Sequence, residues 1–378
     1  MHVGFLCNEY PPAQHGGIGS FTQTLARALV GRGHAVTVLG LYPISQSEEE
    51  ADQGVRVVRL AQGTIPNLRI AVNYLRLQRK LKEIHGATPF DVLEGAERSF
   101  FLVSSSFPAP KIIRMHGGHC YFKVTLGERP GRFMKWQEKR SFRTATHVCA
   151  VSRFVGETTR RLLDLGPIPI PVILNPVNLD VFRPKPEVQE QNGLLVCVGT
   201  VIEKKGIRQL VEAMPRIVEG CPCARLVVYG NDTIHPQTGG SYTEWLLNRI
   251  PARLMDRVTF AGPVSRDRIP GLLAEASVCV YPSHMEALPI AWVEGMAMGK
   301  AVVASQTGPG PEVLNDGVSG LLCDPYSPDS IAHAVLRFLD DPQLRRRMGS
   351  AARLRAEERF SLTALVDENV AYYQSCRW

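Results

Sequence analysis

Short runs of β-branched and apolar residues alternate with helical patterns along almost the whole chain of 378 residues. The segments between these runs carry apolar residues at the three- and four-residue spacing of an amphipathic helix. Such alternation indicates parallel sheets, because parallel strands are joined by a crossover, usually a helix, rather than by a tight turn. The chain is therefore expected to be an α/β protein.

The expected strands form two series, separated by a segment of different composition. Residues 177–193 are rich in Pro, Gln and Glu, which is typical of a linker. The first series is expected at 2–7, 35–40, 55–60, 91–95, 111–115, 146–151 and 171–174. The second is expected at 194–199, 224–230, 257–262, 277–283, 301–305 and 320–324. Two Rossmann-like domains follow, 1–180 and 191–360, with ligands expected beyond the carboxyl ends of the strands, in the cleft between them.

The composition is that of a soluble globular protein, with 44% hydrophobic and 21% charged residues. No stretch has the ~20 apolar residues of a membrane span, and the first residues lack a signal-peptide pattern, so a cytoplasmic location is expected. Nine cysteines are scattered, several of them in expected strands, which is typical of buried thiols. Cys221 and Cys223 lack the spacing of a zinc site, so no structural metal is expected.

The net charge of +7 is distributed unevenly. Residues 1–190 hold 24 Lys and Arg against 16 Asp and Glu, whereas residues 191–378 hold 19 against 20. Between Arg98 and Arg161, 13 basic residues face three acidic ones. A field of this sign attracts phosphorylated molecules, anionic membranes or nucleic acid, although a solvated basic face would give the same pattern.

Two glycines lie where the first expected strand gives way to a helix. In "NEYPPAQHGGIGSF", residues 8–21, Gly16 and Gly17 precede a helix expected at 18–33. Glycine there lets a phosphate or sugar approach N–H groups that carry the positive end of the helix dipole. Thr22 stands where a dinucleotide fingerprint would have its third Gly, so a nicotinamide cofactor is not indicated. Taken alone, the two glycines fit a plain turn equally well.

A similar strand, loop and helix are expected at "VGTVIEKKGI", residues 198–207. Lys204 and Lys205 stand where the helix begins, near Gly206. The helix dipole disfavours cations at this end unless an anion shares the site. We therefore interpret Lys205, next to the glycine, as a phosphate ligand and Lys204 as its solvated neighbour.

Two carboxylates stand in the otherwise apolar segment "YPSHMEALPIAWVEGMAMG", residues 281–299. Glu286 is expected in the loop after a strand. Glu294 is expected in a helix with Pro289 as its first residue, since proline forfeits no hydrogen bond at that position. Carboxylates accept hydrogen bonds from hydroxyls, which is what a sugar or a ribose offers.

Together these segments resemble the retaining nucleotide-sugar glycosyltransferases of family 4, which have the GT-B fold of two Rossmann-like domains facing each other across a cleft. The resemblance is carried, in the family's order, by "YPPAQHGGIGSFTQTLARALVGRGHAVTVL", "RMHGG", "AVSRFV", "ILNPVNLDVF", "VGTVIEKKGI", "VTFAGPVSRDRIPGLLAEASVCVYPS", "EALPIAWVEGMAMGKAVVAS" and "PEVLNDGVSGLLCDP". It implies an enzyme of hexosyltransferase type (EC 2.4) that moves a sugar from a nucleotide donor to a hydroxyl of a glycan, glycolipid or small molecule. It also implies that a C-terminal helix, about 361–378, packs back onto the first domain.

The resemblance implies roles for individual residues. Glu294 would hold the ribose hydroxyls of the donor, and Glu286 would contact the donor sugar near the reacting centre. Lys205 would bind the diphosphate, and His116 in "RMHGG" would line the cleft beside the sugar, so that His116, Lys205 and Glu286 form the catalytic set. The other donor-binding positions are Gly16, Gly17, Thr200, Leu288, Pro289 and Ile290, with Pro263 and Val264 flanking the base.

The chain contains no Asp-any-Asp motif, on which many transferases of the other main fold hold a divalent metal. Transfer without a metal or cofactor is therefore expected, with a UDP-sugar as the first candidate donor and a GDP-sugar as the second. No nucleic acid partner is expected.

Two positions depart from the family's pattern. Thr200 stands where an Arg usually follows the Gly of "VG", so the diphosphate lacks one cation, which Arg266 or Arg268 could replace. The usual Asn-Gly-Val-Asp reads Asn-Pro-Val-Asn at 175–178. Two other functions compete: an NAD-dependent oxidoreductase with two Rossmann-like domains, and a non-catalytic, membrane-bound glycosyltransferase subunit.

One segment of the basic region, "RPGRFMKWQEKRSFR", is expected to be an amphipathic helix. Four cations share one face of it: Arg132, Lys135, Lys139 and Arg143. The opposite face is expected to pack on the domain through Phe133, Met134 and Phe142, with Trp136 at the border. Such a stripe can meet anionic lipid on the inner membrane face, each cation contributing ~1 kcal/mol; a solvated face is the alternative.

Overall fold

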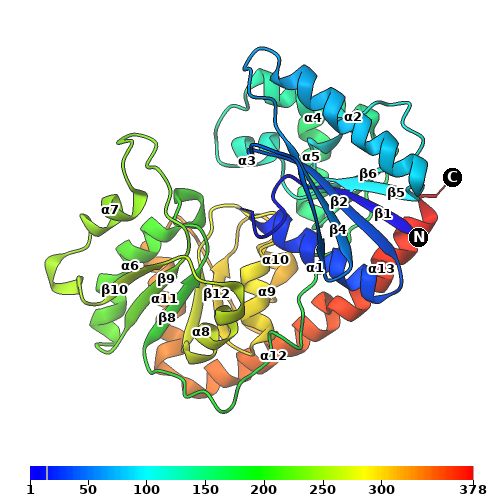
Figure 1. Cartoon of the computed structure of the whole chain (residues 1–378). Helices are drawn as coiled ribbons and strands as arrows, with labels where there is room; N and C mark the ends of the chain where they lie inside the picture. Colours follow the sequence, from blue (N-terminus) through cyan, green and yellow to red (C-terminus); the bar gives the residue numbers. More distant parts are fainter. Residues whose placement is uncertain (14–15, 378) are drawn as a thin grey trace. The chain divides into compact units, whose positions relative to one another are not determined.

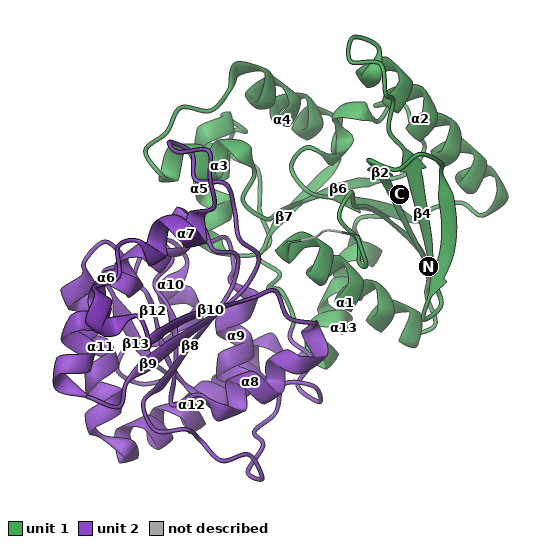
Figure 2. Ribbon diagram, turned by 60° about the vertical axis from the view of Figure 1, so that its left-hand side comes forward, with its two compact units in different colours: residues 1–176, 362–378 green, residues 177–361 purple. Residues whose placement is uncertain are grey.

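The computed structural model describes residues 1–13 and 16–377 and divides the chain into two compact units. Unit 1 comprises Met1–Pro176 and Leu362–Trp378, and unit 2 comprises Val177–Ser361 (Figure 2). The segment predicted as a linker, 177–193, belongs to unit 2, where Val177 pairs with Ser361 and Phe182 is buried.

Unit 1 is built on a seven-stranded sheet in the order β3-β4-β2-β1-β5-β6-β7. All neighbours are parallel except β3, which pairs antiparallel with β4 at the edge of the sheet. The strands are β1 His2–Leu6, β2 Ala35–Tyr42, β3 Glu48–Asp52, β4 Val55–Ala61, β5 Val92–Gly95, β6 Lys111–Met115 and β7 His147–Ala150. The strand predicted at 171–174 is wrong, because only a single bridge, from Val172 to Ala150, forms there.

Helices cover both faces of this sheet. They are α1 Gly17–Gly31, α2 Arg69–Ala87, α3 His119–Thr125, α4 Arg132–Thr144, α5 Arg153–Leu163 and α13 Leu362–Ser375, with a 3-10 turn, η1, at Ser99–Leu102. Figures 1 and 2 show α1 and α13 side by side, with α2 on the other side of the sheet. A buried network ties α13 to the sheet: Arg114 donates to Glu94 and to Asn369, and the hydroxyl of Tyr373 donates to Glu94.

The predicted helix over the basic segment is present as α4, and Phe142 is buried as predicted, but the prediction that Phe133 packs on the domain is wrong. Phe133 and Trp136 are each 51% exposed, and their rings stack with centroids 5.7 Å apart. The buried face consists largely of polar residues: Gln137, Glu138, Ser141, Phe142 and Thr144. The carboxylate of Glu138 is used there to accept hydrogen bonds from the first amides of α3, which explains why a polar face is buried.

Unit 2 is built on a six-stranded, wholly parallel sheet in the order β10-β9-β8-β11-β12-β13. The strands are β8 Leu194–Val198, β9 Arg225–Tyr229, β10 Val258–Gly262, β11 Val278–Tyr281, β12 Ala301–Ser305 and β13 Leu321–Cys323. The helices are α6 Ile207–Gly220, α7 Tyr242–Leu247, α8 Ile269–Glu275, α9 Ile290–Ala297, α10 Gly310–Val313, α11 Pro328–Asp340 and α12 Pro342–Phe360, with 3-10 turns η2 Glu203–Lys205, η3 Ala252–Leu254 and η4 Arg266–Arg268. All six predicted strands of this series are confirmed.

The two strand orders have the same consequence for ligand binding. In unit 2 the chain runs outward from β8 through β9 to β10 on one side and from β11 to β13 on the other. In unit 1 it runs from β1 to β2 on one side and from β5 through β6 to β7 on the other. Loops that leave neighbouring strands in opposite directions open a crevice at the carboxyl edge of the sheet, where α/β proteins bind their ligands. The crevices are therefore expected between the loops after β8 and β11, and between those after β1 and β5.

Candidate functional site

Lys205 and Glu286 lie on the two loops that diverge at the centre of unit 2. Lys205 ends the turn η2 after β8, and Glu286 lies between β11 and α9. The Nζ atom of Lys205 donates a hydrogen bond to Oε1 of Glu286 at 2.5 Å. Gly206 makes this approach possible, because it has a positive φ of 68° and a Cβ there would lie 1.8 Å from the carbonyl oxygen of Pro282. The predicted phosphate cation and sugar carboxylate are therefore neighbours.

The neighbouring Lys204 is only partly exposed, so the prediction of a freely solvated side chain is wrong. It is half-buried, and burial lowers the pKa of its ammonium. Its carbonyl accepts a hydrogen bond of 2.8 Å from the amide of His284, which joins the loop after β8 to the loop after β11 a second time.

Glu294 is buried in the second turn of α9 and is paired with a cation that the sequence did not assign to it. Nη2 of Arg266, in η4, donates to Oε1 of Glu294 at 2.7 Å. Burial raises the pKa of Glu294 to about 7, and the charge of Arg266 opposes that increase. The guanidinium also lies 5.7 Å from the centre of the Phe182 ring. Arg266 thus favours the charged form of Glu294, the carboxylate predicted to bind the ribose.

The start of α9 differs by one residue from the prediction. Pro289 is the N-cap, with an extended ψ of 105°, and Ile290 is the first helical residue. The first amides of a helix have no acceptor within it, so those of Ile290 and Ala291 can donate to an anion. Leu288 is buried beside them, 6% exposed.

The remaining predicted donor residues of unit 2 also follow strands. Thr200 follows β8 and is exposed. Pro263 and Val264 follow β10, and Pro263 is the more exposed of the two. The structure thus brings all the predicted positions of unit 2 to the carboxyl edge of one sheet.

In unit 1, Gly16 and Gly17 begin α1, but a carboxylate of the chain already occupies two of the local amides. Oε1 of Glu9 accepts from the amide of Gly16 at 3.2 Å and from that of Gly19 at 2.7 Å. A Cβ at Gly17 would meet nothing within 4 Å, so the backbone there is open to a ligand. Gln14 and His15 of the quoted motif lie outside the described residues.

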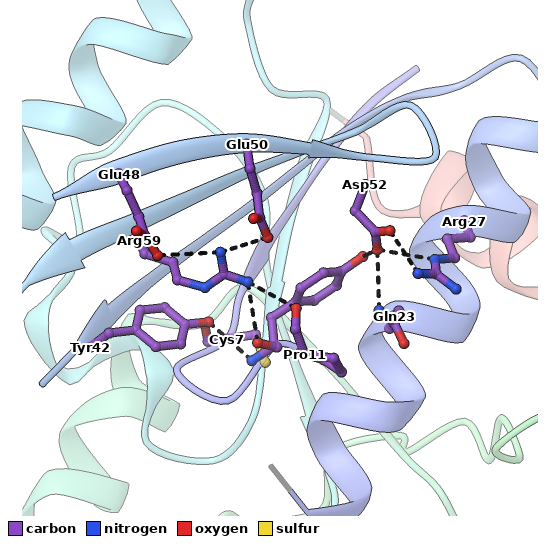
Figure 3. Close-up of polar contacts among 10 residues, drawn as sticks. Cys7, Pro11, Gln23, Arg27, Tyr42, Glu48, Glu50, Asp52 and Arg59 are labelled. Carbon is purple, nitrogen blue, oxygen red and sulfur yellow. Dashed lines mark hydrogen bonds and ion pairs between the residues drawn. The ribbon is translucent and has the colours of Figure 1, made fainter. Parts of the chain in front are cut away.

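The loop that carries these glycines is anchored on β3 and β4 (Figure 3). The hydroxyl of Tyr10 donates to Oδ2 of Asp52 at 2.6 Å, and Asp52 also pairs with Arg27 of α1. Nη2 of Arg59 donates to the carbonyl of Pro11 at 2.9 Å. The acidic strand β3 therefore fixes the position of the loop after β1.

His116 follows β6 and is enclosed, 9% exposed. Its ring packs against that of Phe21 with centroids 4.8 Å apart. Burial, with the nearby charge of Arg114, lowers the pKa of His116 to about 3. The ring is therefore neutral at physiological pH, which suits lining of a site better than proton transfer.

Sequence reasoning missed Glu97, which follows β5 and is 2% exposed. Burial raises the pKa of Glu97 to about 8, and the charge of Glu138 adds to the increase, whereas backbone hydrogen bonds from Gly117 and His116 oppose it. Its Oε1 has no hydrogen-bond partner within the described part of the chain. A neutral carboxyl group thus supports the loop that carries His116. The only sequence signal for it was its place directly after a strand.

Within residues 1–13 and 16–377, no helix is both long and apolar enough to cross a membrane. The same residues contain no cluster of three or more His, Cys, Asp or Glu side chains that could hold a metal ion.

Comparison with known proteins covers nearly the whole chain. Residues 15–181 match the protein family described as Glycosyltransferase Family 4, and residues 180–355 match the family described as Glycosyl transferases group 1. A relative of 30% identity is the GDP-mannose-dependent alpha-(1-6)-phosphatidylinositol monomannoside mannosyltransferase of Mycobacterium tuberculosis, with 93% of this chain and 92% of that protein covered.

Two solved structures share the fold of two Rossmann-like domains. Sucrose-phosphate synthase from Thermosynechococcus elongatus has a TM-score of 0.85 at 22% identity, with 99% of this chain and 98% of that chain covered. Anabaena Alr3699/HepE in complex with UDP-glucose has a TM-score of 0.77 at 18% identity, with 99% and 100% covered. At these identities the likeness shows the fold, which is GT-B.

Proposed function

The chain belongs to the family 4 glycosyltransferases, GT-B enzymes that take a sugar from a nucleotide donor, and we propose that it transfers this sugar to a hydroxyl with retention of configuration and without a metal. The single observation that carries the proposal is the pairing of Lys205 with Glu286 at the switch point of unit 2. It puts a cation and a hydroxyl-accepting carboxylate where a sugar diphosphate needs them.

The chemistry follows from the charge that develops. When the bond between sugar and diphosphate breaks, negative charge builds on the phosphate oxygens. Lys205 and the first amides of α9 are fixed donors that stabilise this charge. Glu286 accepts from sugar hydroxyls, and Glu294 accepts from the ribose. By resemblance to the family, the leaving phosphate assists removal of the proton from the acceptor hydroxyl, so no side-chain nucleophile is assigned.

We propose a UDP-sugar as the first candidate donor and a GDP-sugar as the second. The HepE structure is described as a complex with UDP-glucose, and the mannosyltransferase relative is named as GDP-mannose-dependent. A thermal-shift panel of UDP-, GDP-, ADP- and dTDP-sugars tests the choice, since a ligand that binds the native state raises its melting temperature. Stabilisation by the GDP-sugar alone would reverse the order.

Metal independence has a direct test. Adding EDTA should leave the transfer rate unchanged, whereas a rate that is abolished by EDTA and rescued by Mg²⁺ would overturn this part of the proposal. Retention is tested separately by NMR assignment of the anomeric configuration of the product, and an inverted product would reject it.

The proposed location is cytoplasmic and peripheral on the inner membrane face, through α4. The side chains of Arg132, Lys135, Lys139 and Arg143 make no hydrogen bond or ion pair with any described residue, which leaves their charges available to anionic lipid. The exposed, stacked rings of Phe133 and Trp136 beside them suit insertion at the interface. Loss of sedimentation with anionic vesicles when the four cations become Gln would support this contact, and its persistence would remove it.

A non-catalytic, membrane-bound subunit is the second candidate function. It is favoured by Thr200 in place of the usual Arg together with the exposed surface of α4. Release of UDP from UDP-sugars by the purified chain would exclude it. The oxidoreductase alternative is dropped, because both halves of the chain match glycosyltransferase families.

A further inference from the structure

Unit 1 contains a pocket of about 570 Å³ that no predicted residue of the transfer site lines. It is formed by the end of α4, the start of β7, the end of α5, the segment 165–171 and Tyr372 of α13. β7 begins at His147, so the pocket lies at the amino edge of the sheet, whereas Gly16 and His116 follow the carboxyl ends of β1 and β6. The pocket is therefore separate from the predicted donor-binding residues of unit 1.

The walls of this amino-edge pocket are largely apolar. Phe142 and Leu163 line it and are buried. Ile168, Pro169 and Pro171 are exposed on one side, with Ile168 38% accessible. The volume of the pocket lies within the range of about 300 to 1,000 Å³ that is usual for small-molecule sites, which are also lined mainly by apolar side chains.

The rim carries a net positive charge. Lys139 and Arg143 line the pocket from the last two turns of α4, and neither pairs with a residue among those that the structure describes. The C-terminal end of a helix favours cations, so the fold can hold these two there without a carboxylate partner. Asp164 is the one acidic lining residue, and burial lowers the pKa of His147, which keeps that ring neutral. Two cations against one carboxylate leave the rim positive.

We propose that the amino-edge pocket binds an anionic amphiphile, with its phosphate at Lys139 and Arg143 and its hydrocarbon chain along Phe142, Leu163 and Ile168. A phosphate alone would leave the apolar walls in contact with water, and a plain hydrocarbon would leave the two cations unused. The proposal extends the membrane contact suggested for α4 and does not depend on glycosyl transfer. The ligand chemistry is shared by a membrane phospholipid and a soluble alkyl phosphate.

The primary experiment is calorimetric titration of the full chain with decyl phosphate below its critical micelle concentration. We expect binding at least tenfold tighter than that of inorganic phosphate or decanol. Lys139→Gln with Arg143→Gln should weaken it at least tenfold, and Ile168→Asn should weaken it through the apolar wall alone. Equal affinity for inorganic phosphate, or an affinity that none of these substitutions changes, would overturn the proposal.

A matched control lies on the same helix. Arg132→Gln with Lys135→Gln removes the same charge from α4 outside the pocket, and we expect decyl phosphate binding to stay unchanged. A decrease equal to that of the pocket variant would mean a diffuse charge effect and would reject the site. UDP affinity, measured for every variant, reports on folding and on the donor site, so failure of the transferase proposal is seen separately.

Vesicles distinguish the two sources of the ligand. If sedimentation with phosphatidylglycerol vesicles decreases in the Ile168→Asn variant as well as in the charge variants, the pocket takes a membrane lipid. If it decreases only in the charge variants while decyl phosphate still binds in the pocket, the ligand is a soluble amphiphile. Both results support the site, whereas absence of decyl phosphate binding rejects it.

Discussion

The ammonium nitrogen of Lys205 lies 2.5 Å from Oε1 of Glu286, where the loops after β8 and β11 diverge. Each residue is thus the counter-ion of the other, with their side chains 26% and 10% exposed. A donor diphosphate would give Lys205 a second negative partner. Glu286 could then accept hydrogen bonds from the sugar, so donor binding and the release of this carboxylate are coupled.

Lys205→Ala should lower turnover by about two orders of magnitude, because a fixed charge aimed at developing negative charge is removed. The measurement is kcat with a saturating donor. Arg216→Ala is a suitable control, since this exposed residue pairs with Asp329 away from the predicted site and should leave kcat unchanged. A Lys205→Ala variant that keeps its full rate would assign the diphosphate to another cation.

Substitutions of Glu286 and Glu294 should affect different quantities, kcat for the first and UDP affinity for the second. Glu294→Ala should weaken UDP binding by ~1.5 to 3 kcal/mol, the contribution of hydrogen bonds to a charged acceptor. Glu286→Gln should reduce kcat more than it reduces UDP affinity, because the sugar rather than the nucleotide loses its partner. Calorimetry and steady-state kinetics on the folded variants test both. Equal loss of affinity in the two variants would contradict this division of roles.

UDP affinity should depend on pH through Glu294. Its pKa of about 7 means that the carboxylate able to accept from both ribose hydroxyls forms only as pH rises through neutrality. Arg266→Gln removes the charge that opposes the effect of burial, so the midpoint of the profile should move to higher pH. Titrations between pH 6 and 9 check this. Arg268→Gln, an exposed neighbour in η4, should leave the midpoint in place, and an unmoved midpoint in Arg266→Gln would reject the coupling.

Glu97 should make unit 1 less stable at alkaline pH. Its folded pKa of about 8 lies above the ordinary value of 4.5, so its contribution is fully present below pH 4.5 and is lost progressively as pH rises from there through 8. At ~1.4 kcal/mol per pKa unit, the loss by pH 9 is on the order of a few kcal/mol. Glu97→Gln, which stays neutral, should abolish this slope in urea unfolding. Glu128→Gln, an exposed acid, is the control, and a slope that persists in Glu97→Gln would contradict the assignment.

The fold was predictable where local pattern and tertiary pairing agree. The strands of unit 2 are apolar runs buried in a parallel sheet, so hydrophobicity alone located them. Glu48–Asp52 was not predicted as a strand, because four of its five residues are acidic. It forms because Arg56 and Arg59 of β4 pair with those carboxylates across the edge. Residues 171–174 have a strand-like composition but gain only one bridge.

The site was predictable only in part, for a related reason. Residues directly after expected strands, such as Lys205 and Glu286, could be placed at one edge, since parallel strands share a direction. Contacts between residues that are far apart in the sequence could not be predicted. Arg266 and Glu294 are 28 positions apart, and nothing in their spacing shows that they meet. The carboxylate of Glu9 was missed because the donors that it accepts from are backbone amides, which carry no sequence signal.

The buried pair of Arg114 and Glu94 should be a main support of unit 1. Nε of Arg114 donates to Oε1 of Glu94 at 2.8 Å, and the two side chains are 0% and 2% exposed. Glu94→Ala leaves the guanidinium unpaired inside the protein, which typically costs ~3 to 5 kcal/mol. It also removes the acceptor of Tyr373 in α13.

Urea unfolding of three variants tests this estimate. Asn369→Ala, which removes only a neutral partner of the same arginine, should cost ~1 to 3 kcal/mol. Glu49→Ala breaks the exposed pairs of Glu49 with Arg56 and Lys80 and should cost at most about 1 kcal/mol for each pair. If Glu94→Ala were no more destabilising than Glu49→Ala, the charge of Arg114 would have to be compensated by its carbonyl contact to Ile173, and α13 would not depend on this network.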